Sequence, residues 1–180
     1  MNQTALLVID LQRGAFDGAR IAPIAHADTL IGHAATLVAA ARGAGVPVVF
    51  IQHGEDEGPF ETRTPHWELH EALAPQPGEG RVHKRQSSAF DGTGLAGQLQ
   101  ALGARDLILC GLQSEFCVSN TARSALAQGF AVTVVQDAHG TWPEGGETAE
   151  AISARVNAQL QAAGARLATT QDLARSLANG

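Results

Sequence analysis

The chain has 180 residues, of which 44% are hydrophobic, so it is long enough for one well-cored domain and short for two. Its net charge of -6 at pH 7 argues against a general nucleic-acid-binding protein, and its densest basic run, 81–85, lies beside an apolar strand. No apolar run approaches the roughly 20 residues of a membrane span, and the N-terminus has neither a basic region nor a signal-peptide cleavage site. We therefore expect a single cytoplasmic domain over residues 1–180, with a small molecule or a protein as its partner.

Hydrophobic periods of two and of 3.6 residues alternate along the chain, as repeated β–α units require. A buried strand over 4–10 precedes an amphipathic helix over 28–42, which Asp28 caps and Gly43 ends. Strands separated by helices predict an α/β fold, in which a parallel sheet is covered on both faces. The remaining expected elements are strands at 46–52, 81–84, 106–110, 130–136 and 166–168, and helices at 95–102, 117–128, 148–163 and from 171 onward.

A long irregular insert is expected over 53–80. Within it, 67–73 predicts a short helix, entered after Pro65 and closed before Pro75. His66 and His70 have the spacing that places two imidazoles on one helical face. No third metal ligand accompanies them, so we interpret them as a solvated face and expect no metal there.

Three polar residues follow three of the expected strands. Asp10 ends the first, Lys84 ends the third and is the only lysine of the chain, and Cys117 lies just past the fourth. Carboxyl ends of parallel strands are where such folds bind ligands, and a carboxylate, an ammonium and a thiol supply a base, a charge stabiliser and a nucleophile. Each residue alone also has a structural interpretation: Asp10 as a capping residue, Lys84 as a surface lysine that is single by chance, and Cys117 as a small buried apolar residue. With Cys110 as the only other cysteine and no CxxC spacing, neither a disulfide framework nor a zinc ribbon is indicated.

The segments 7–12, 84–90 and 111–118 resemble the three signature segments of the isochorismatase-like cysteine hydrolases, a family that includes nicotinamidases and N-carbamoylsarcosine amidohydrolases. The resemblance implies a six-stranded, mostly parallel sheet in a three-layer α/β/α arrangement, a catalytic set of Asp10, Lys84 and Cys117, no organic cofactor, and a homo-oligomer. It also implies a cis peptide bond between Leu112 and Gln113, with the N–H groups of Gln113 and Cys117 forming an oxyanion hole.

Departures from the family pattern narrow the expected activity. Family nicotinamidases carry an Asp-x-His metal pair, whereas here Ile51 stands two positions before His53, so we expect that metal site to be missing. True isochorismatases lack the nucleophilic cysteine, so Cys117 places the chain with the amidases. The implied reaction is hydrolysis of a small amide, ureide or carbamoyl compound through a thioester. We further expect Lys84 and a helix N-terminus to lower the thiol pKa from its usual value of about 8.5.

Pocket residues are less well defined by the sequence, and the insert is the expected specificity element. Two other functions stay open: a catalytically silent member of the same fold, and a redox or thiol-protective protein that uses Cys117. Residues that could face the substrate are Gln12 and Phe16 after the first strand, Trp67 and Phe90 as walls, and His53 or His139 as contacts.

Overall fold

Six parallel strands form the central sheet, in the order β3-β2-β1-β4-β5-β6. The structure, a computed structural model, describes residues 3–179. The predicted α/β fold is confirmed, and all six strands are parallel rather than most of them. The strands are β1 (Thr4–Ile9), β2 (Val48–His53), β3 (Gly80–Lys84), β4 (Asp106–Leu112), β5 (Ala131–Gly140) and β6 (Arg166–Ala168).

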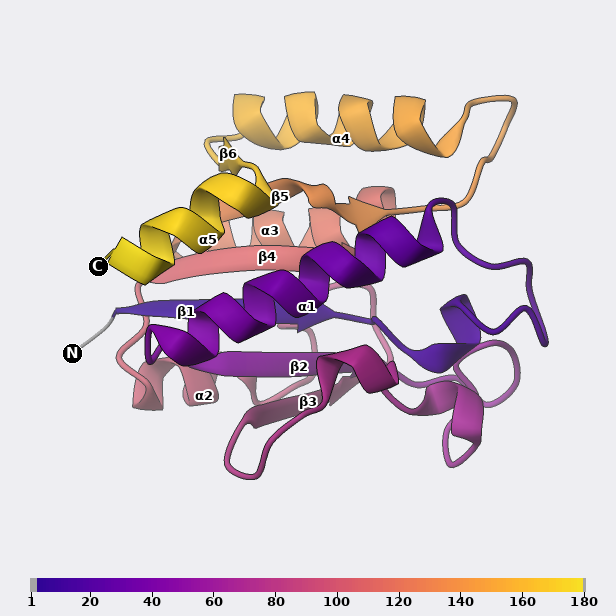
Figure 1. Cartoon of the computed structure of the whole chain (residues 1–180), viewed down its shortest axis with the longest axis horizontal. Coiled ribbons are helices and arrows are strands. Elements are labelled where there is room, and N and C mark those ends of the chain that lie inside the picture. The colour runs from indigo at the N-terminus through magenta and orange to yellow at the C-terminus, as the bar shows by residue number, and fades with distance from the viewer. Residues whose placement is uncertain (1–2, 180) are drawn as a thin grey trace.

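Helices cover both faces of this sheet and build two separate cores (Figure 1). Successive residues of a buried strand point to opposite faces, so Leu6 and Val8 join one core while Leu7 and Ile9 join the other. No helix within residues 3–179 is long and apolar enough to cross a bilayer. One face carries α1 (Ala27–Gly43) and α5 (Thr170–Asn179), and the other carries α2 (Leu95–Ala101), α3 (Ser119–Ala127) and α4 (Ala149–Ala162).

The start of α1 differs from the sequence prediction. His26, in a left-handed conformation, occupies the N-cap position, and no side chain caps the helix. Asp28 lies inside the first turn instead, where a carboxylate interacts favourably with the helix dipole without capping it.

The expected helix over 67–73 is wrong. The insert forms two 3₁₀ turns, Pro65–Trp67 and Glu71–Leu73, separated by an extended stretch in which Leu69 pairs with Gln12 in an antiparallel bridge. This bridge satisfies backbone groups that a helix would otherwise use. His66 and His70 therefore belong to different turns: His66 contacts Asp17, and His70 packs edge-on against Phe16.

The turn after β4 also departs from prediction. A single π-helical turn, η4 (Ser114–Val118), precedes α3, so Cys117 lies inside a helical turn rather than at the first residue of a helix. Gly111 makes the approach to this turn possible, because at its φ of 126° a Cβ atom would lie 1.9 Å from the carbonyl oxygen of Ile9. Only glycine fits between β1 and β4 at the edge where both strands deliver polar residues.

Candidate active site

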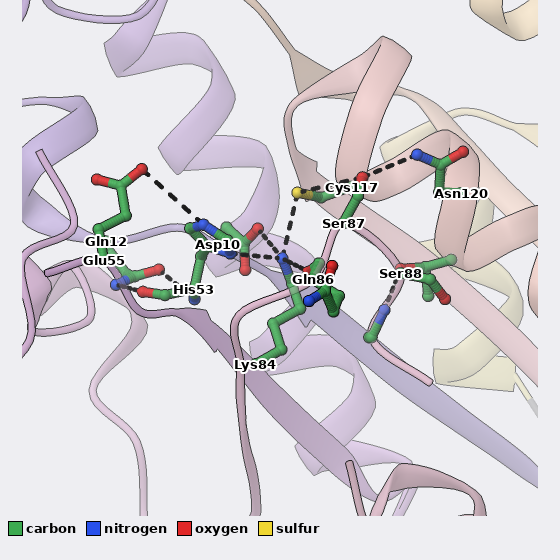
Figure 2. A network of polar contacts seen from close by, with 12 residues as sticks. Asp10, Gln12, His53, Glu55, Lys84, Gln86, Ser87, Ser88, Cys117 and Asn120 are labelled. Atoms are coloured by element: carbon green, nitrogen blue, oxygen red, sulfur yellow. Dashed lines mark hydrogen bonds and ion pairs between the residues drawn. The ribbon is translucent and has the colours of Figure 1, made fainter. Parts of the chain in front are cut away.

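The structure brings Asp10, Lys84 and Cys117 together at the carboxyl edge of the sheet, as the sequence predicted. Lys84 Nζ lies 2.8 Å from Asp10 Oδ2 and 3.2 Å from Cys117 Sγ. Figure 2 shows the ammonium group between the carboxylate and the thiol. Asp10 adopts a left-handed backbone conformation, with φ of 53°, directly after β1, and its N–H donates to Ile51 O at 2.9 Å.

Lys84 is held on every side, and its side chain is 0% exposed. Besides the contacts above, Nζ donates to Gln86 O at 3.2 Å and lies 3.3 Å from His53 Nδ1. Burial disfavours the ammonium, but Asp10 and Cys117 outweigh it, so the pKa of Lys84 is raised. Burial lowers the pKa of His53 to about 4, and Lys84 and Arg85 lower it further. His53 is therefore neutral at pH 7, and its Nδ1 accepts from the Lys84 ammonium.

Asp10 is a buried carboxylate with one free oxygen. Burial raises its pKa above the usual value, although Lys84 and the Cys117 thiol act in the opposite direction. Oδ2 is paired with Lys84, whereas Oδ1 is buried and has no hydrogen-bond partner within residues 3–179. The Cys117 side chain and the His53 backbone both lower the pKa of this carboxyl, so both lie close to it.

The pKa of Cys117 corrects the sequence expectation. Burial and the Asp10 carboxylate raise it to about 11, and Lys84 only partly offsets them. Burial penalises the charged thiolate relative to the neutral thiol. The thiol is therefore protonated at pH 7. Ser87 Oγ lies 4.0 Å from Cys117 Sγ and accepts from Asn120 Nδ2 at 2.8 Å.

Neither Ser87 nor Asn120 was singled out from the sequence. The available signal was the position of Ser87 within the segment 84–90, three residues after Lys84. Asn120 lies in α3, and its contact depends on how that helix packs beside the loop after β3.

A family model for the isochorismatase domain matches residues 4–172. The chain belongs to this family of hydrolases. A streptothricin hydrolase from Streptomyces noursei is 40% identical over 139 residues, which cover 77% of this chain and 50% of that protein. The matched part thus spans about half the length of that relative. Ureidoacrylate amidohydrolase RutB from Caulobacter vibrioides is 28% identical over 176 residues, covering 75% of this chain and 76% of the relative. A crystal structure from Oleispira antarctica, assigned as an isochorismatase hydrolase, aligns with a TM-score of 0.90 at 30% identity over 97% of both chains.

The Leu112–Gln113 peptide bond of this isochorismatase-family chain is cis, the geometry that the resemblance implied. Gln113 precedes η4, and its carbonyl accepts from the N–H groups of Phe116 and Val118 at 3.2 and 3.1 Å. The Gln113 N–H thus stands at the junction between β4 and the turn that carries Cys117.

Two of the expected pocket residues, Gln12 and His139, have side chains that are hydrogen-bonded to neighbouring parts of the protein. The buried Gln12 amide donates to the carbonyl oxygens of His53 and Trp67 at 3.0 and 2.9 Å and accepts from His53 N–H at 2.8 Å. It ties the end of β1 to β2 and to the insert. Both ring nitrogens of the buried His139 are likewise in use, Nδ1 with Ser114 Oγ and Nε2 with Asn157 Oδ1.

The two phenylalanines expected near the pocket each contact another ring. Phe16 contacts His70, with ring centroids 4.8 Å apart, and Phe90 contacts Phe130, with centroids 6.0 Å apart. Phe16 directly follows the 3₁₀ turn Arg13–Ala15, and its ring lies beside His70 of the insert.

Trp67 does line a cavity of about 570 Å³, whose wall includes Lys84 and Gln86. Its indole Nε1 is buried and has no hydrogen-bond partner within the described chain. Arg63 lines the same cavity. Among residues 3–179, no group of three or more His, Cys, Asp or Glu side chains is arranged to hold a metal ion.

Proposed function

We propose that this isochorismatase-family hydrolase cleaves the C–N bond of a small amide, ureide or carbamoyl compound, with Cys117 as nucleophile and a thioester as intermediate. The observation that carries the proposal is the position of Lys84 Nζ, 2.8 Å from Asp10 Oδ2 and 3.2 Å from Cys117 Sγ. One ammonium group holds a buried carboxylate beside a thiol, which is the arrangement that nucleophilic acyl transfer requires.

The first half-reaction acylates Cys117. As Sγ attacks the carbonyl carbon, the thiol proton passes to Asp10 and the π electrons of the carbonyl move onto its oxygen. Because the thiol pKa is about 11, the proton leaves during the attack rather than before it. The raised pKa of Asp10 makes it a stronger base for this transfer, and its free Oδ1 is the acceptor atom.

The backbone N–H groups of Gln113 and Cys117 stabilise the tetrahedral oxyanion in this proposal. When the intermediate collapses, the C–N bond breaks, and the nitrogen takes the proton from Asp10 and leaves as ammonia or an amine. Water then attacks the thioester and gives a proton to Asp10; the S–C bond breaks, the acid departs and the proton returns to Sγ. Lys84 stays protonated throughout and holds both partners in place.

The size of the neighbouring cavity and the named relatives support a small-molecule substrate. The cavity of about 570 Å³ shares Lys84 and Gln86 with the thiol site, and small-molecule sites commonly measure about 300–1,000 Å³. One relative is named for hydrolysis of streptothricin, and another is named an amidohydrolase of ureidoacrylate. Neither compound is assigned to this chain.

The redox alternative is less well supported by the site. Oxidation to sulfenic acid follows thiolate character, and burial holds the pKa of Cys117 at about 11. A protonated thiol beside a carboxylate suits general-base catalysis better than reaction with an oxidant.

An ammonia-release screen tests the proposal. Purified protein is incubated with primary amides, ureides and carbamoyl compounds, including nicotinamide and N-carbamoylglycine, and ammonia is measured for the wild type, Cys117→Ala and Cys110→Ala. We expect release by the wild type and by Cys110→Ala, which removes the other thiol from the core, and none by Cys117→Ala. Ammonia release by Cys117→Ala at the wild-type rate would overturn the proposed function.

A further inference from the structure

A polar network packs against the turn that carries Cys117; Ser114 and His139 are buried, and Ser153 and Asn157 are half-buried. Ser114 is 0% exposed and His139 6% exposed. Ser114 Oγ lies 2.8 Å from His139 Nδ1 and 3.0 Å from Ser153 Oγ, and His139 Nε2 lies 2.8 Å from Asn157 Oδ1. This polar network thus links η4 to β5 and α4, which contribute none of the proposed catalytic residues.

The donor and acceptor in each hydrogen bond of this network follow from the orientation of Asn157. Asn157 Nδ2 donates to Gln136 O at 3.3 Å, so Asn157 Oδ1 faces His139 and accepts from Nε2–H. Nδ1 of the neutral ring then carries no proton and accepts from the Ser114 hydroxyl. Because Ser114 has only one proton to give, Ser153 is the donor to Ser114 Oγ. Each hydroxyl and ring nitrogen therefore has one defined role.

The position of Ser114 connects this polar network to the proposed active site. Ser114 directly follows Gln113 and is the first residue of the π-helical turn that carries Cys117. A second contact ties the same turn to the residue that follows β5, since Thr141 Oγ1 donates to Glu115 Oε1 at 2.7 Å. A single π-helical turn is rare in proteins and is found mostly at functional sites, and here contacts from Ser114 and Glu115 hold it to neighbouring elements.

We propose that Ser114, oriented by His139, Ser153 and Asn157, is a positioning residue that aims the backbone N–H groups of Gln113 and Cys117 at the substrate oxygen. This inference rests on the proposed function, because it assumes that a carbonyl carbon bonds to Cys117 Sγ. The polar network acts through the turn η4 and contacts no reacting atom.

The test separates the oxyanion site from the reactivity of the thiol itself. Butyraldehyde adds to a thiol by forming an S–C bond while the thiol proton passes to the aldehyde oxygen, which then occupies the proposed oxyanion position. Its dissociation constant is measured by protection of Cys117 from iodoacetamide, followed by peptide mass spectrometry. The rate of alkylation without aldehyde reports the thiol alone. The variants are Ser114→Ala and Asn157→Ala, with Ser124→Ala as matched control, because Ser124 forms a comparable hydroxyl pair with Ser88 at 2.9 Å.

We expect Ser114→Ala to weaken butyraldehyde binding about tenfold or more and to lower kcat on the fastest panel compound by a similar factor, with KM within about threefold. Its alkylation rate should change by less than about twofold. Asn157→Ala should act in the same direction more weakly and covers the case in which Ser114→Ala fails to fold. Ser124→Ala should resemble the wild type. Equal aldehyde affinities for Ser114→Ala and Ser124→Ala, or a matching loss of alkylation rate, would overturn the positioning role. Absence of aldehyde protection in the wild type would instead count against the oxyanion site and the proposed function.

Discussion

Replacing Lys84 by arginine preserves the charge but not the shape, and we expect it to inactivate the protein almost as fully as Cys117→Ala. Four atoms lie within 3.3 Å of Nζ, belonging to Asp10, Cys117, Gln86 and His53, and the side chain is 0% exposed. A guanidinium is a broad planar fork that cannot occupy the same space. It must displace the thiol or the carboxylate, and a misplacement of about 1 Å costs roughly a hundredfold in rate.

The same exchange should also strain the fold. Extra volume in a well-packed interior costs about 1–3 kcal/mol, which for a protein of this size corresponds to about 2–4 °C in Tm for each kcal/mol. Ammonia release and thermal unfolding by circular dichroism measure the two effects. Arg85→Lys is the matched control, because Arg85 is the next residue, is 60% exposed and pairs with Asp56 at the surface. Turnover of Lys84→Arg within about threefold of the wild type would refute the reasoning, since so small a loss is far from the roughly hundredfold expected.

Four further outcomes are expected. Activity should fall as pH decreases through the raised pKa of Asp10, because the base must be ionised. The midpoint of the acid limb of kcat/KM should therefore lie above the usual aspartate pKa of about 3.9. A midpoint below that value would exclude Asp10 as the base. Burial raises the pKa of Cys110 from 9.0 to about 12. The free energy of unfolding that this shift contributes is complete below pH 9 and is lost as pH rises toward 12, by on the order of 4 kcal/mol. In urea unfolding across this range, the free energy of unfolding should therefore decline more steeply for the wild type than for Cys110→Ala. Turnover should survive dialysis against strong chelators, since Ile51 stands where a metal-binding aspartate would be; loss that zinc, manganese or iron reverses would contradict this. Light scattering at micromolar concentration should give at least a dimer, and a monomer would remove that expectation.

The convergence of Asp10, Lys84 and Cys117 could be predicted because it depends on topology more than on detail. Parallel strands deliver their carboxyl ends to one edge, so three residues far apart in the sequence meet once the strands are assigned correctly. The need for glycine at 111 emerges only from the structure, where the close approach of Ile9 O excludes any side chain.

Trp67 was predicted to line the pocket, but most of the pocket could not be predicted, because it depends on contacts within the insert. Gln12 was expected to face substrate, yet its amide is used on the backbone of His53 and Trp67. The backbone bridge between Gln12 and Leu69 takes the place of the expected helix over 67–73, and two 3₁₀ turns flank it. The direction of the Cys117 pKa shift was wrong for a related reason: neighbouring charges can be inferred from the sequence, whereas burial, which is the largest cause of the shift, depends on the packed site.

In the proposed reaction Cys117 carries the acyl group between the two half-reactions, and this acyl-enzyme can be trapped. Protein is mixed with its fastest substrate, quenched with acid within milliseconds and analysed by intact and peptide mass spectrometry. We expect a mass increase equal to the acyl group on the peptide that contains Cys117, absent from Cys117→Ala and retained in Cys110→Ala. Acylation of a different residue, or full turnover by Cys117→Ala, would contradict it.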